Sequence, residues 1–384
     1  MVTLVEPPLS LYVHLPWCLS KCPYCDFNSY SAPAEPLREA RRDEYVSALR
    51  RDIQRQRDFS RQRRLHSVFI GGGTPSLFTP DEIGAVLDSA DRTFGFESDA
   101  EITLEVNPGA LERGSFQGYR AAGVNRVSIG AQSFSAKSLQ VLGRLHGPKD
   151  TIDAVASAQA AGFDRINLDV MQGLPHQDLA AGIADIEQAL ALGVDHVSHY
   201  QLTLEPNTVF FAKPPPFPDD ETLDAINTAA AARLQQAGFH NYEVSAWARG
   251  ASRSQHNLNY WRFGDYLAIG AGAHGKLTRD GQLWRYAHAA NPRRYLDEID
   301  APVELERIEA AQRRFEFMLN ALRLNEGFSR ALFEQRTGCA IGSVATALQQ
   351  AEQRQLLQRS QDEVWQPTST GRRFLNDLQA IFLP

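Results

Sequence analysis

Residues 10–25 read SLYVHLPWCLSKCPYC, and this stretch decides the fold. Its first six residues form an apolar run of the kind found in buried β-strands, and a loop with three cysteines follows at once. The cysteines are spaced as Cys18-x3-Cys22-x2-Cys25, a cluster that rarely arises by chance. A strand that leads directly into such a loop predicts an α/β protein with its site at the carboxyl edge of a sheet.

Three thiols on one loop are compatible with few kinds of site. A disulfide framework needs paired cysteines and an oxidising compartment, and the sequence indicates neither. A structural zinc site needs four ligands, and beside these cysteines only His14 lies close in sequence. Three thiolates with one open position suit a [4Fe–4S] cluster. The fourth cysteine, Cys339, stands alone in a TGCAIG context and is interpreted as a small buried hydrophobic residue.

Five further strand-like runs follow the first, with helical patterns between them. The predicted strands are 10–15, 66–70, 101–106, 125–130, 164–170 and 195–202. The predicted helices are 36–60, 80–93, 109–122, a broken helix over 136–162, 178–192 and 219–238. Strands that alternate with crossover helices imply a parallel sheet with right-handed connections. The pattern predicts a partial (β/α)6 barrel, with a doubly wound open sheet as the alternative.

Polar residues gather at the carboxyl ends of these predicted strands, where α/β proteins build their sites. The turn Gly71–Gly73 lets the backbone approach a ligand, because no Cβ stands in the way. Glu105 and Asp169 suit ribose hydroxyls or an ammonium group, and Arg144 suits a carboxylate. The other residues at this edge are Thr74, Pro75, Asn107, Gln132, Ser133, Gln172, His199, Gln201 and Thr203.

The chain is expected to divide into three regions. Residues 1–238 would form the barrel, 239–302 a connecting region, and 303–384 a small, mostly helical domain. In the last region, the pattern predicts helices at 304–323, 328–336, 342–358 and 369–382 and a short strand at 363–366. This order fits a winged-helix-like domain. It shows no basic recognition face, so we expect a lid or a docking surface and not a DNA-binding element.

Composition excludes several classes of function. The net charge of −7, from 39 basic and 46 acidic residues, argues against a nucleic-acid partner. The segment Arg38–Arg64 holds ten arginines together with five acidic residues, and we interpret it as a solvated amphipathic helix. No apolar run approaches the ~18 residues of a spanning helix. The N-terminus has no basic, signal-like segment, so we expect a cytoplasmic protein.

Several motifs in combination resemble a known family. CxxxCxxC, GGGTP and a Glu-x-Asn-Pro strand end are similar to the radical S-adenosylmethionine (SAM) superfamily, and more narrowly to the oxygen-independent coproporphyrinogen oxidase group. The stretches that carry the narrower resemblance are LYVHLPWC, CPYCDFNS, FIGGGTPS, LEVNPG, RVSIGAQSF, LGRLHG, NLDVMQGLP and YQLTLEPNT. Within that group, CPYCDFNS and the later HNLNYW resemble HemW-type haem chaperones.

The resemblance implies a cofactor site. Cys18, Cys22 and Cys25 would ligate a [4Fe–4S] cluster, and SAM would bind the open iron through its amino and carboxylate groups. The glycine-rich turn would take the ammonium group, Arg144 the carboxylate and Asp169 a ribose hydroxyl. The residues that the resemblance places in the SAM pocket are Tyr12, Tyr24, Gly72, Gly73, Thr74, Glu105, Gln132, Arg144, Asp169 and Thr203.

One departure separates the two relatives. The oxidases carry a further Cys two residues after the third, and here that position is Phe27, whereas HemW-type chaperones lack this Cys too. The segment His256-Asn257-Leu258-Asn259-Tyr260-Trp261 is the predicted haem site. An exposed His256 would ligate iron and the aromatic rings would pack on the porphyrin, with His274 as a second candidate ligand.

The resemblance therefore implies a haem chaperone on a radical SAM scaffold. It would bind haem, a cluster and SAM, and hand haem to an acceptor protein. The sequence does not identify the acceptor, and membrane-associated proteins are among the candidates. The chain would act as a monomer or a homodimer. The alternative is a radical SAM enzyme of the coproporphyrinogen oxidase type, acting on a porphyrin-related substrate. Both share the cluster and SAM sites, so the sequence leaves open whether the protein is an enzyme.

Overall fold

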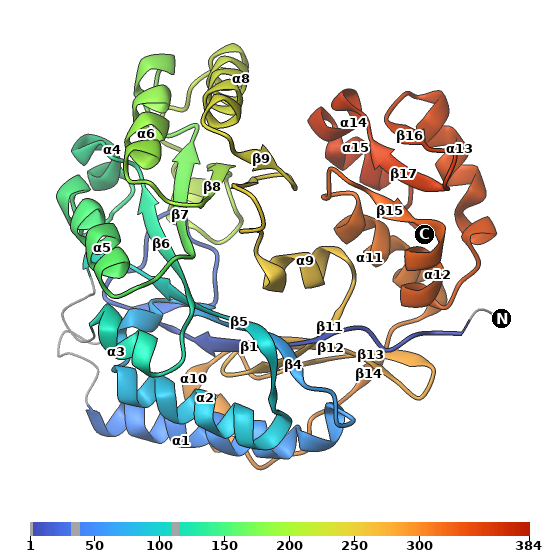
Figure 1. Cartoon of the computed structure of the whole chain (residues 1–384), viewed down its shortest axis with the longest axis horizontal. Helices are drawn as coiled ribbons and strands as arrows, with labels where there is room; N and C mark the ends of the chain where they lie inside the picture. The colour runs from blue at the N-terminus through green and yellow to red at the C-terminus, as the bar shows by residue number, and fades with distance from the viewer. Residues whose placement is uncertain (1–2, 32–38, 110–114) are drawn as a thin grey trace.

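The computed structural model describes residues 3–31, 39–109 and 115–384. Its main feature is a curved sheet whose six barrel strands are parallel and lie in chain order (Figure 1). These are β1 (Leu9–Leu15), β4 (Leu65–Gly72), β5 (Phe96–Val106), β6 (Arg126–Gln132), β7 (Ile166–Gln172) and β8 (His196–Gln201). All six predicted strands are confirmed. A doubly wound sheet would reverse direction from a central first strand, so the observed order supports the partial barrel and not the alternative.

Helices cover the outer, convex face of the barrel strands (Figure 1). They are α1 (Glu39–Arg55), α2 (Pro80–Phe94), α3 (Phe116–Ala121), α4 (Ala136–Val141), α5 (Pro148–Ala160), α6 (Leu179–Ala191) and α8 (Asp220–Gln236). The broken helix expected over 136–162 is confirmed as α4 and α5. Residues 36–38 and 110–114, at the starts of two predicted helices, lie outside the described residues. A capping box between Thr79 and Glu82 begins α2, which explains its sharp start.

The sheet continues beyond both sides of the barrel. The added strands are β9 (His240–Asn241), β10 (Ala246–Ala248), β11 (Asp265–Ile269), β12 (His274–Arg279), β13 (Gln282–Ala287) and β14 (Glu306–Arg307). β10 pairs antiparallel with β8, whereas β11 pairs parallel with β1 and begins the β11–β14 extension. The sequence pattern predicts none of these strands. β9, β10 and β14 have only two or three residues each, and β11–β13 follow one another without the helices of the βα alternation. The sheet crosses residues 238 and 302, so the division into three regions stays a prediction.

α9 (Gln255–Trp261) holds the whole HNLNYW segment and lies on the concave side of the sheet, against β4 (Figure 1). Ser254 accepts a hydrogen bond from the N–H of Asn257 and thereby caps the helix. The amide of Asn259 donates to the hydroxyl of Ser10 and to the carbonyl of Asp265, near the beginnings of β1 and β11. α9 therefore closes the barrel near the amino ends of its strands, opposite the edge where the cysteine loop begins.

The C-terminal region forms a small domain with its own core. The predicted helices and strand are present, but the first helix begins only at Ala310, after β14, and the last is interrupted at Phe374. Its elements are α11 (Ala310–Ala321), β15 (Phe328–Ser329), α12 (Arg330–Thr337), α13 (Ala345–Gln353), β16 (Leu357–Arg359), β17 (Val364–Pro367), α14 (Ser369–Arg373) and α15 (Leu375–Ala380). Phe317, Phe328, Phe333 and Trp365 pack together at its centre. Cys339 is partly buried against this core, which fits its interpretation as a packing residue.

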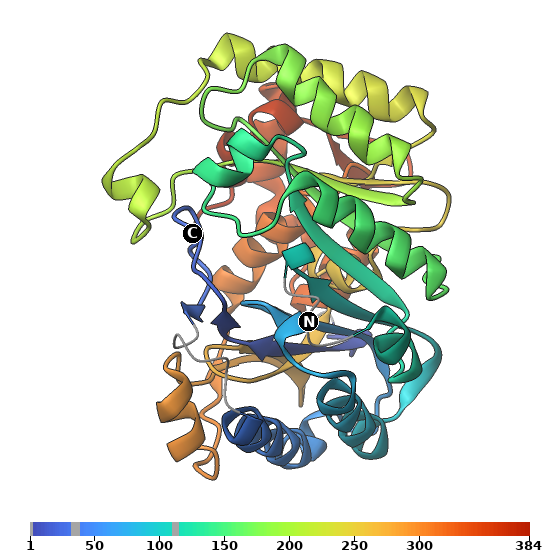
Figure 2. The same cartoon turned by 90° about the vertical axis from the view of Figure 1, so that its left-hand side faces the viewer.

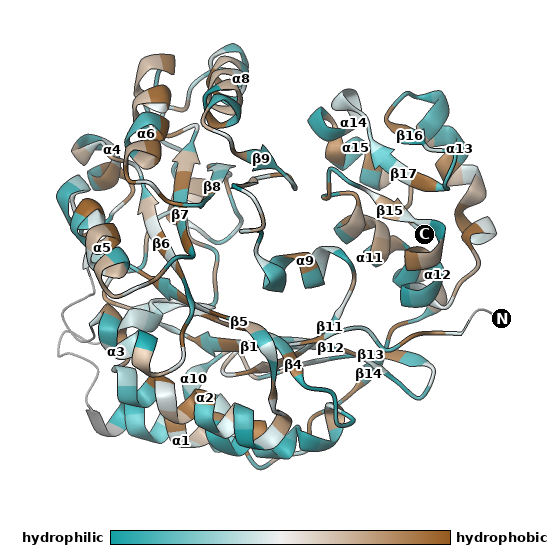
Figure 3. Cartoon of the chain, viewed as in Figure 1, coloured by the Kyte–Doolittle hydropathy of each residue, from teal (hydrophilic) through white to brown (hydrophobic). Residues whose placement is uncertain are grey.

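The arginine-rich segment is confirmed as a mostly solvated helix, apart from Arg38, which lies outside the described residues. α1 buries Tyr45 and Leu49, and most of its visible surface is hydrophilic (Figure 3). Several of the following arginines form ion pairs, among them Arg61 with Asp280 and Arg63 with Asp265. Among the described helices, none combines the length and apolar character needed to cross a bilayer.

Candidate functional site

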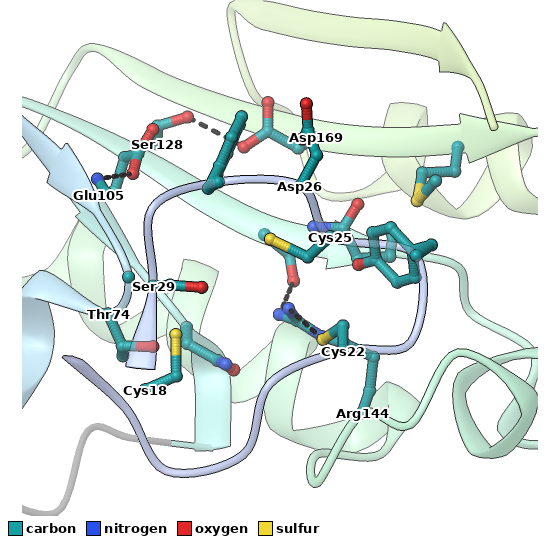
Figure 4. A pocket seen from close by; sticks show the side chains of 18 of the residues that line it. Cys18, Cys22, Cys25, Asp26, Ser29, Thr74, Glu105, Ser128, Arg144 and Asp169 are labelled. Atoms are coloured by element: carbon teal, nitrogen blue, oxygen red, sulfur yellow. Dashed lines mark hydrogen bonds between the residues drawn. The ribbon is translucent and has the colours of Figure 1, made fainter. Parts of the chain in front are cut away.

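A cavity of about 400 Å³ opens at the carboxyl ends of the barrel strands, and the three clustered cysteines line it (Figure 4). Its volume falls within the ~300–1,000 Å³ range of ligand pockets. The predicted SAM residues that line it are Tyr24, Gly72, Gly73, Thr74, Glu105, Gln132, Arg144, Asp169 and Thr203. Tyr12 is the one that does not, because it lies further back on β1, with its hydroxyl 2.9 Å from Nδ1 of His14.

The cysteine loop is held by the sheet on one side and by α7 (Val209–Ala212) on the other (Figure 2). β2 (Trp17–Cys18) and β3 (Tyr30–Ser31) pair across the loop and close it. The N–H of Phe210 donates to a loop carbonyl, and the Asn28 amide donates to two carbonyls that follow β11 and β13. His14 uses its ring nitrogens on Tyr12 and on the Asn28 carbonyl, so it does not point a free nitrogen at the thiols.

The glycine turn after β4 passes directly beside the cysteine loop. A Cβ on Gly73 would lie 2.5 Å from the carbonyl oxygen of Trp17, which is far inside van der Waals contact. Gly72 has a φ of +116°, a conformation that other residues rarely adopt. The N–H of Gly72 donates to Oε2 of Glu105 at 3.1 Å. The glycines are therefore needed to bring the turn, the loop and Glu105 together.

Arg144 enters the cavity from the segment after α4. Its Nη2 donates to the carbonyl of Gly130 at 2.9 Å, and its Nη1 lies 3.9 Å from Sγ of Cys22. Its buried Nε has no hydrogen-bond partner among the described residues. A guanidinium with an unused donor beside a thiol suits an anionic group in the cavity. A thiolate-ligated cluster and a ligand carboxylate are both groups of this kind.

Two half-buried carboxyl groups, Glu105 on β5 and Asp169 on β7, face the cavity from the strands on either side of β6. Burial, and then the nearby charge of Asp169, raise the pKa of Glu105 to about 8. Burial also raises the pKa of Asp169, against hydrogen bonds from Asn167 and Ser128. Raised values mean that these carboxyl groups lack a compensating positive charge. A cationic ligand, or one rich in hydroxyl groups, would supply what the two side chains lack.

Some residues that line the cavity were not predicted, and some predicted residues do not line it. Side chains alternate along a strand, so the face of Gln132 on β6 is shared by Ser128 and Gly130, and Met171 on β7 shares the face of Asp169. Steps of two residues along each strand, back from Gln132 and forward from Asp169, would have found them. Ser133, Gln172 and His199 are predicted at the same edge but do not line the cavity. Ser133 donates to Asp185, and burial lowers the pKa of His199 to about 4.

The family comparisons agree with this arrangement. The Radical SAM superfamily model matches residues 12–189, and the HemN C-terminal domain model matches residues 308–374. A protein of Haemophilus influenzae named "Heme chaperone HemW" is 44% identical over 98% of both chains. The chain belongs to the HemW family. The Escherichia coli protein of the same name is 43% identical over 98% of both chains.

A solved structure supports the fold of this HemW family member. The coproporphyrinogen III oxidase HemN of Escherichia coli matches 98% of this chain and 90% of its own, with a TM-score of 0.80 and 22% identity. At that identity the likeness concerns the fold. It covers both the barrel and the C-terminal domain, which confirms the predicted radical SAM architecture.

The predicted exposure of His256 is wrong. His256 is 1% exposed, because α9 packs its ring against Phe69 inside the barrel. Its Nδ1 lies 3.0 Å from the Ser67 hydroxyl and its Nε2 lies 3.1 Å from the Tyr260 hydroxyl. Burial lowers the pKa of His256 to about 3, so the ring is neutral. An iron ligand would have to replace one of these hydrogen bonds, and the sequence pattern alone gave no sign of them.

The other haem-segment residues differ in their surroundings. Trp261 packs under the guanidinium of Arg323, 4.3 Å from its ring centroid, and its buried Nε1 has no partner among the described residues. Asn257 belongs to the capped first turn of α9. Tyr260 lines a second cavity, described below. His274 is exposed at the start of β12, at the same edge of the sheet as the cysteine loop and not beside α9.

Proposed function

We propose that this protein is a haem chaperone that binds haem and transfers it to an acceptor protein. The observation that carries the proposal is the 44% identity, over 98% of both chains, to a protein named Heme chaperone HemW. An identity spread over the whole length includes the barrel, α9 and the C-terminal domain. A shared barrel alone would support a radical SAM scaffold but no particular cargo.

In this proposal the carboxyl-edge cavity holds a [4Fe–4S] cluster on Cys18, Cys22 and Cys25, and SAM beside it. The donor set fits. Three thiols lie on one loop, and Arg144 stands beside Cys22 to balance thiolate charge. Burial raises the pKa values of Cys18 and Cys25, so these thiols stay protonated until a metal group displaces the protons. Among the described residues, no three metal-binding side chains converge as around one ion, and a four-iron cluster, whose thiolates sit on separate irons, does not require it.

In this proposal, different side chains of the cavity bind different groups of SAM. Arg144 offers its unused Nε and its Nη groups to the carboxylate. Glu105, next to the glycine turn, suits the ammonium group, and Asp169 suits a ribose hydroxyl. A bound cluster supplies one-electron chemistry and an open iron position. The protein's part is to place the ligand between the thiols and the two carboxyl groups.

The alternative, a coproporphyrinogen oxidase activity, lacks specific support. Phe27 occupies the position of the oxidases' additional Cys, and it is an apolar side chain, 58% exposed, at the rim of the cavity. It can neither ligate a metal nor carry a proton. The cytoplasmic location stays a prediction of the same proposal, which names no acceptor.

The test is anaerobic reconstitution of the full chain, followed by two assays on one sample. We expect stoichiometric haem binding in a titration followed by the Soret band, and no conversion of coproporphyrinogen III with SAM and a reductant. Haem affinity no better than that of an unrelated protein of similar size would contradict the chaperone function. Formation of protoporphyrinogen would establish the oxidase instead.

A further inference from the structure

A second cavity, of about 310 Å³, lies between the β11–β13 strands and α11 of the C-terminal domain. Four aromatic side chains line it: Tyr260, Phe263, Tyr266 and Phe315. The polar side chains that line it are Lys276, Arg285, Gln312, Glu316 and Asn320. Leu319 also contributes to the lining and is 41% exposed. Aromatic walls with a few charged groups are typical of sites for flat organic ligands.

The charge at this cavity favours an anion. Lys276, only 3% exposed, lies 3.4 Å from the carboxylate of Asp265, and Arg63 reaches the same carboxylate at 2.7 Å. Two cations therefore share one fully buried carboxylate. Arg285 pairs with Glu316 at 2.6 Å, and Arg63 also lies 3.9 Å from Glu6, so among the described residues that line the cavity Lys276 is the cation left with only a shared carboxylate. Buried charge is costly unless it is paired, so an anionic group near Lys276 and Arg285 would stabilise this arrangement.

We propose that this cavity binds one edge of a flat aromatic carboxylate and, resting on the proposed function, that the carboxylate is a propionate of haem. Offset or edge-to-face contacts with Tyr260, Phe263 and Phe315 would hold the ring edge. Arg285 would give the propionate charge-assisted hydrogen bonds. The volume is near the lower limit of ligand pockets, so the cavity takes an edge and leaves the rest of the macrocycle outside.

The cavity gives the HNLNYW segment a way to contribute to haem binding although its histidine is buried. Tyr260 is the residue of the segment that lines the cavity, and the neighbouring His256 holds its hydroxyl from behind at 3.1 Å. The ring of Tyr260 also packs edge-on against Tyr266, with centroids 4.5 Å apart. His256 is therefore a positioning residue that fixes one aromatic wall.

Binding through an edge also suits a protein that must release its cargo. None of the described residues that line this cavity is a histidine, cysteine or methionine. The axial positions of the iron would remain available to an acceptor that offers such a ligand. Contacts to the periphery provide specificity, while the stronger iron ligand of the acceptor draws the haem away.

The experiment compares Leu319→Glu with Ile152→Glu in the full chain. Leu319 and Ile152 both lie in helices, and the two residues are similarly exposed, 41% and 38%. Ile152, however, is on α5, on the outside of the barrel. A carboxylate at Leu319 would repel the propionate, so we expect haem affinity to fall about 10-fold, with Ile152→Glu within about twofold of the wild type. Arg285→Gln should weaken haem binding in the same direction.

A second probe needs no variant. Haem dimethyl ester keeps the ring and the iron but lacks both carboxylates, so the unmodified protein should bind it about 10-fold more weakly than haem. Equal affinities of wild type, Leu319→Glu and Arg285→Gln for haem would overturn the cavity assignment while leaving the chaperone function intact. Unchanged binding of the ester would overturn the propionate contact. Failure of the wild type to bind haem at all would instead contradict the proposed function.

Discussion

The cavity at the carboxyl ends of the barrel strands is lined by thiols and by two half-buried carboxyl groups, whereas the cavity beside α9 is lined by aromatic rings and cations. Glu105 and Asp169 lack a positive partner in the first, and Lys276 shares Asp265 with Arg63 in the second. The two cavities therefore differ in charge and should bind different ligands. A sulfonium compound with an ammonium group suits the first cavity, and a carboxylate-bearing ring suits the second.

A chain of buried polar groups connects the two ends of the barrel. Each residue of this chain is hydrogen-bonded to the next, either between side chains or from a backbone N–H to a side chain. In order, the residues are Asp169, Asn167, His196, Tyr242, Ser254, Glu101, His256 and Tyr260. Burial opposes the ionisation of Glu101, but Arg126 and Arg165 outweigh it and lower its pKa. The network fixes the positions of both sites. We predict that each cavity binds its ligand independently.

The largest effect is expected at the cysteine loop. Cys22→Ala should abolish the cluster, and with it the broad visible absorption of the anaerobically reconstituted protein, because the loop then offers only the thiols of Cys18 and Cys25. Cys339→Ala is the matched control, since that thiol packs in the C-terminal domain, and it should keep the full absorption. Iron and sulfide analysis measures both. A full cluster content in Cys22→Ala would refute the ligand assignment.

Arg144→Ala should weaken SAM binding while leaving the cluster in place. Removing a charge-assisted hydrogen bond costs about 1.5–3 kcal/mol, or roughly 10- to 150-fold in affinity. Asp169→Ala should act in the same direction. Calorimetric titration with SAM measures the change, and haem affinity should stay at the wild-type value in both variants. Unchanged SAM affinity in both variants would show that Arg144 and Asp169 do not bind SAM in the carboxyl-edge cavity.

His256→Ala should destabilise the protein by about 1–3 kcal/mol, because the buried Tyr260 hydroxyl loses its partner, while Ser67 keeps only its hydrogen bond with Ser10. His274→Ala removes an exposed ring and should change stability by no more than about 0.5 kcal/mol. Denaturant unfolding measures both. The Soret maximum of bound haem should stay in place in His256→Ala. A shifted maximum would mean that α9 opens and that His256 ligates iron.

The smallest expected effect is a pH dependence of stability and of SAM binding that arises from Glu105. With a pKa of about 8, Glu105 is mostly protonated at pH 7 in the folded protein, whereas at its ordinary value of 4.5 it would be ionised in the unfolded chain. The folded state therefore binds more protons in this window, so this group makes stability fall as pH rises from about 4.5 to 8. A cationic ligand favours the ionised form, so SAM binding at pH 7 should release up to about one proton. Calorimetry in two buffers counts it, and Glu105→Gln should remove the release.

The barrel could be predicted from the sequence because its strands are long apolar runs that alternate with helices. The same reasoning placed Glu105, Asp169 and the glycine turn at one edge, since parallel strands end together. It missed Ser128 and Met171 because it considered single polar residues at the strand ends and not the other residues on the same face, four positions before Gln132 and two after Asp169. It misjudged His256 because burial there depends on Ser67 and Phe69, which lie far away in sequence.

The second cavity could not be predicted for a related reason. Its walls come from α9, from the short strands β11–β13 and from α11, and no single stretch of sequence carries the pattern. Lys276 and Arg285 read as ordinary charged residues of a polar segment. Only the pairing of β11 with β1, and the packing of α11 beside α9, bring them to the same cavity as Tyr260.

The most direct test of two separate sites is a crossed titration of two variants with two ligands. Cys22→Ala and Leu319→Glu, prepared anaerobically as full chains, are each titrated with SAM and with haem. Separate sites predict that Cys22→Ala loses SAM binding but keeps haem affinity, and that Leu319→Glu loses about 10-fold in haem affinity but binds SAM as the wild type does. Loss of haem binding in Cys22→Ala, with Leu319→Glu unaffected, would place haem at the carboxyl-edge cavity and contradict the account.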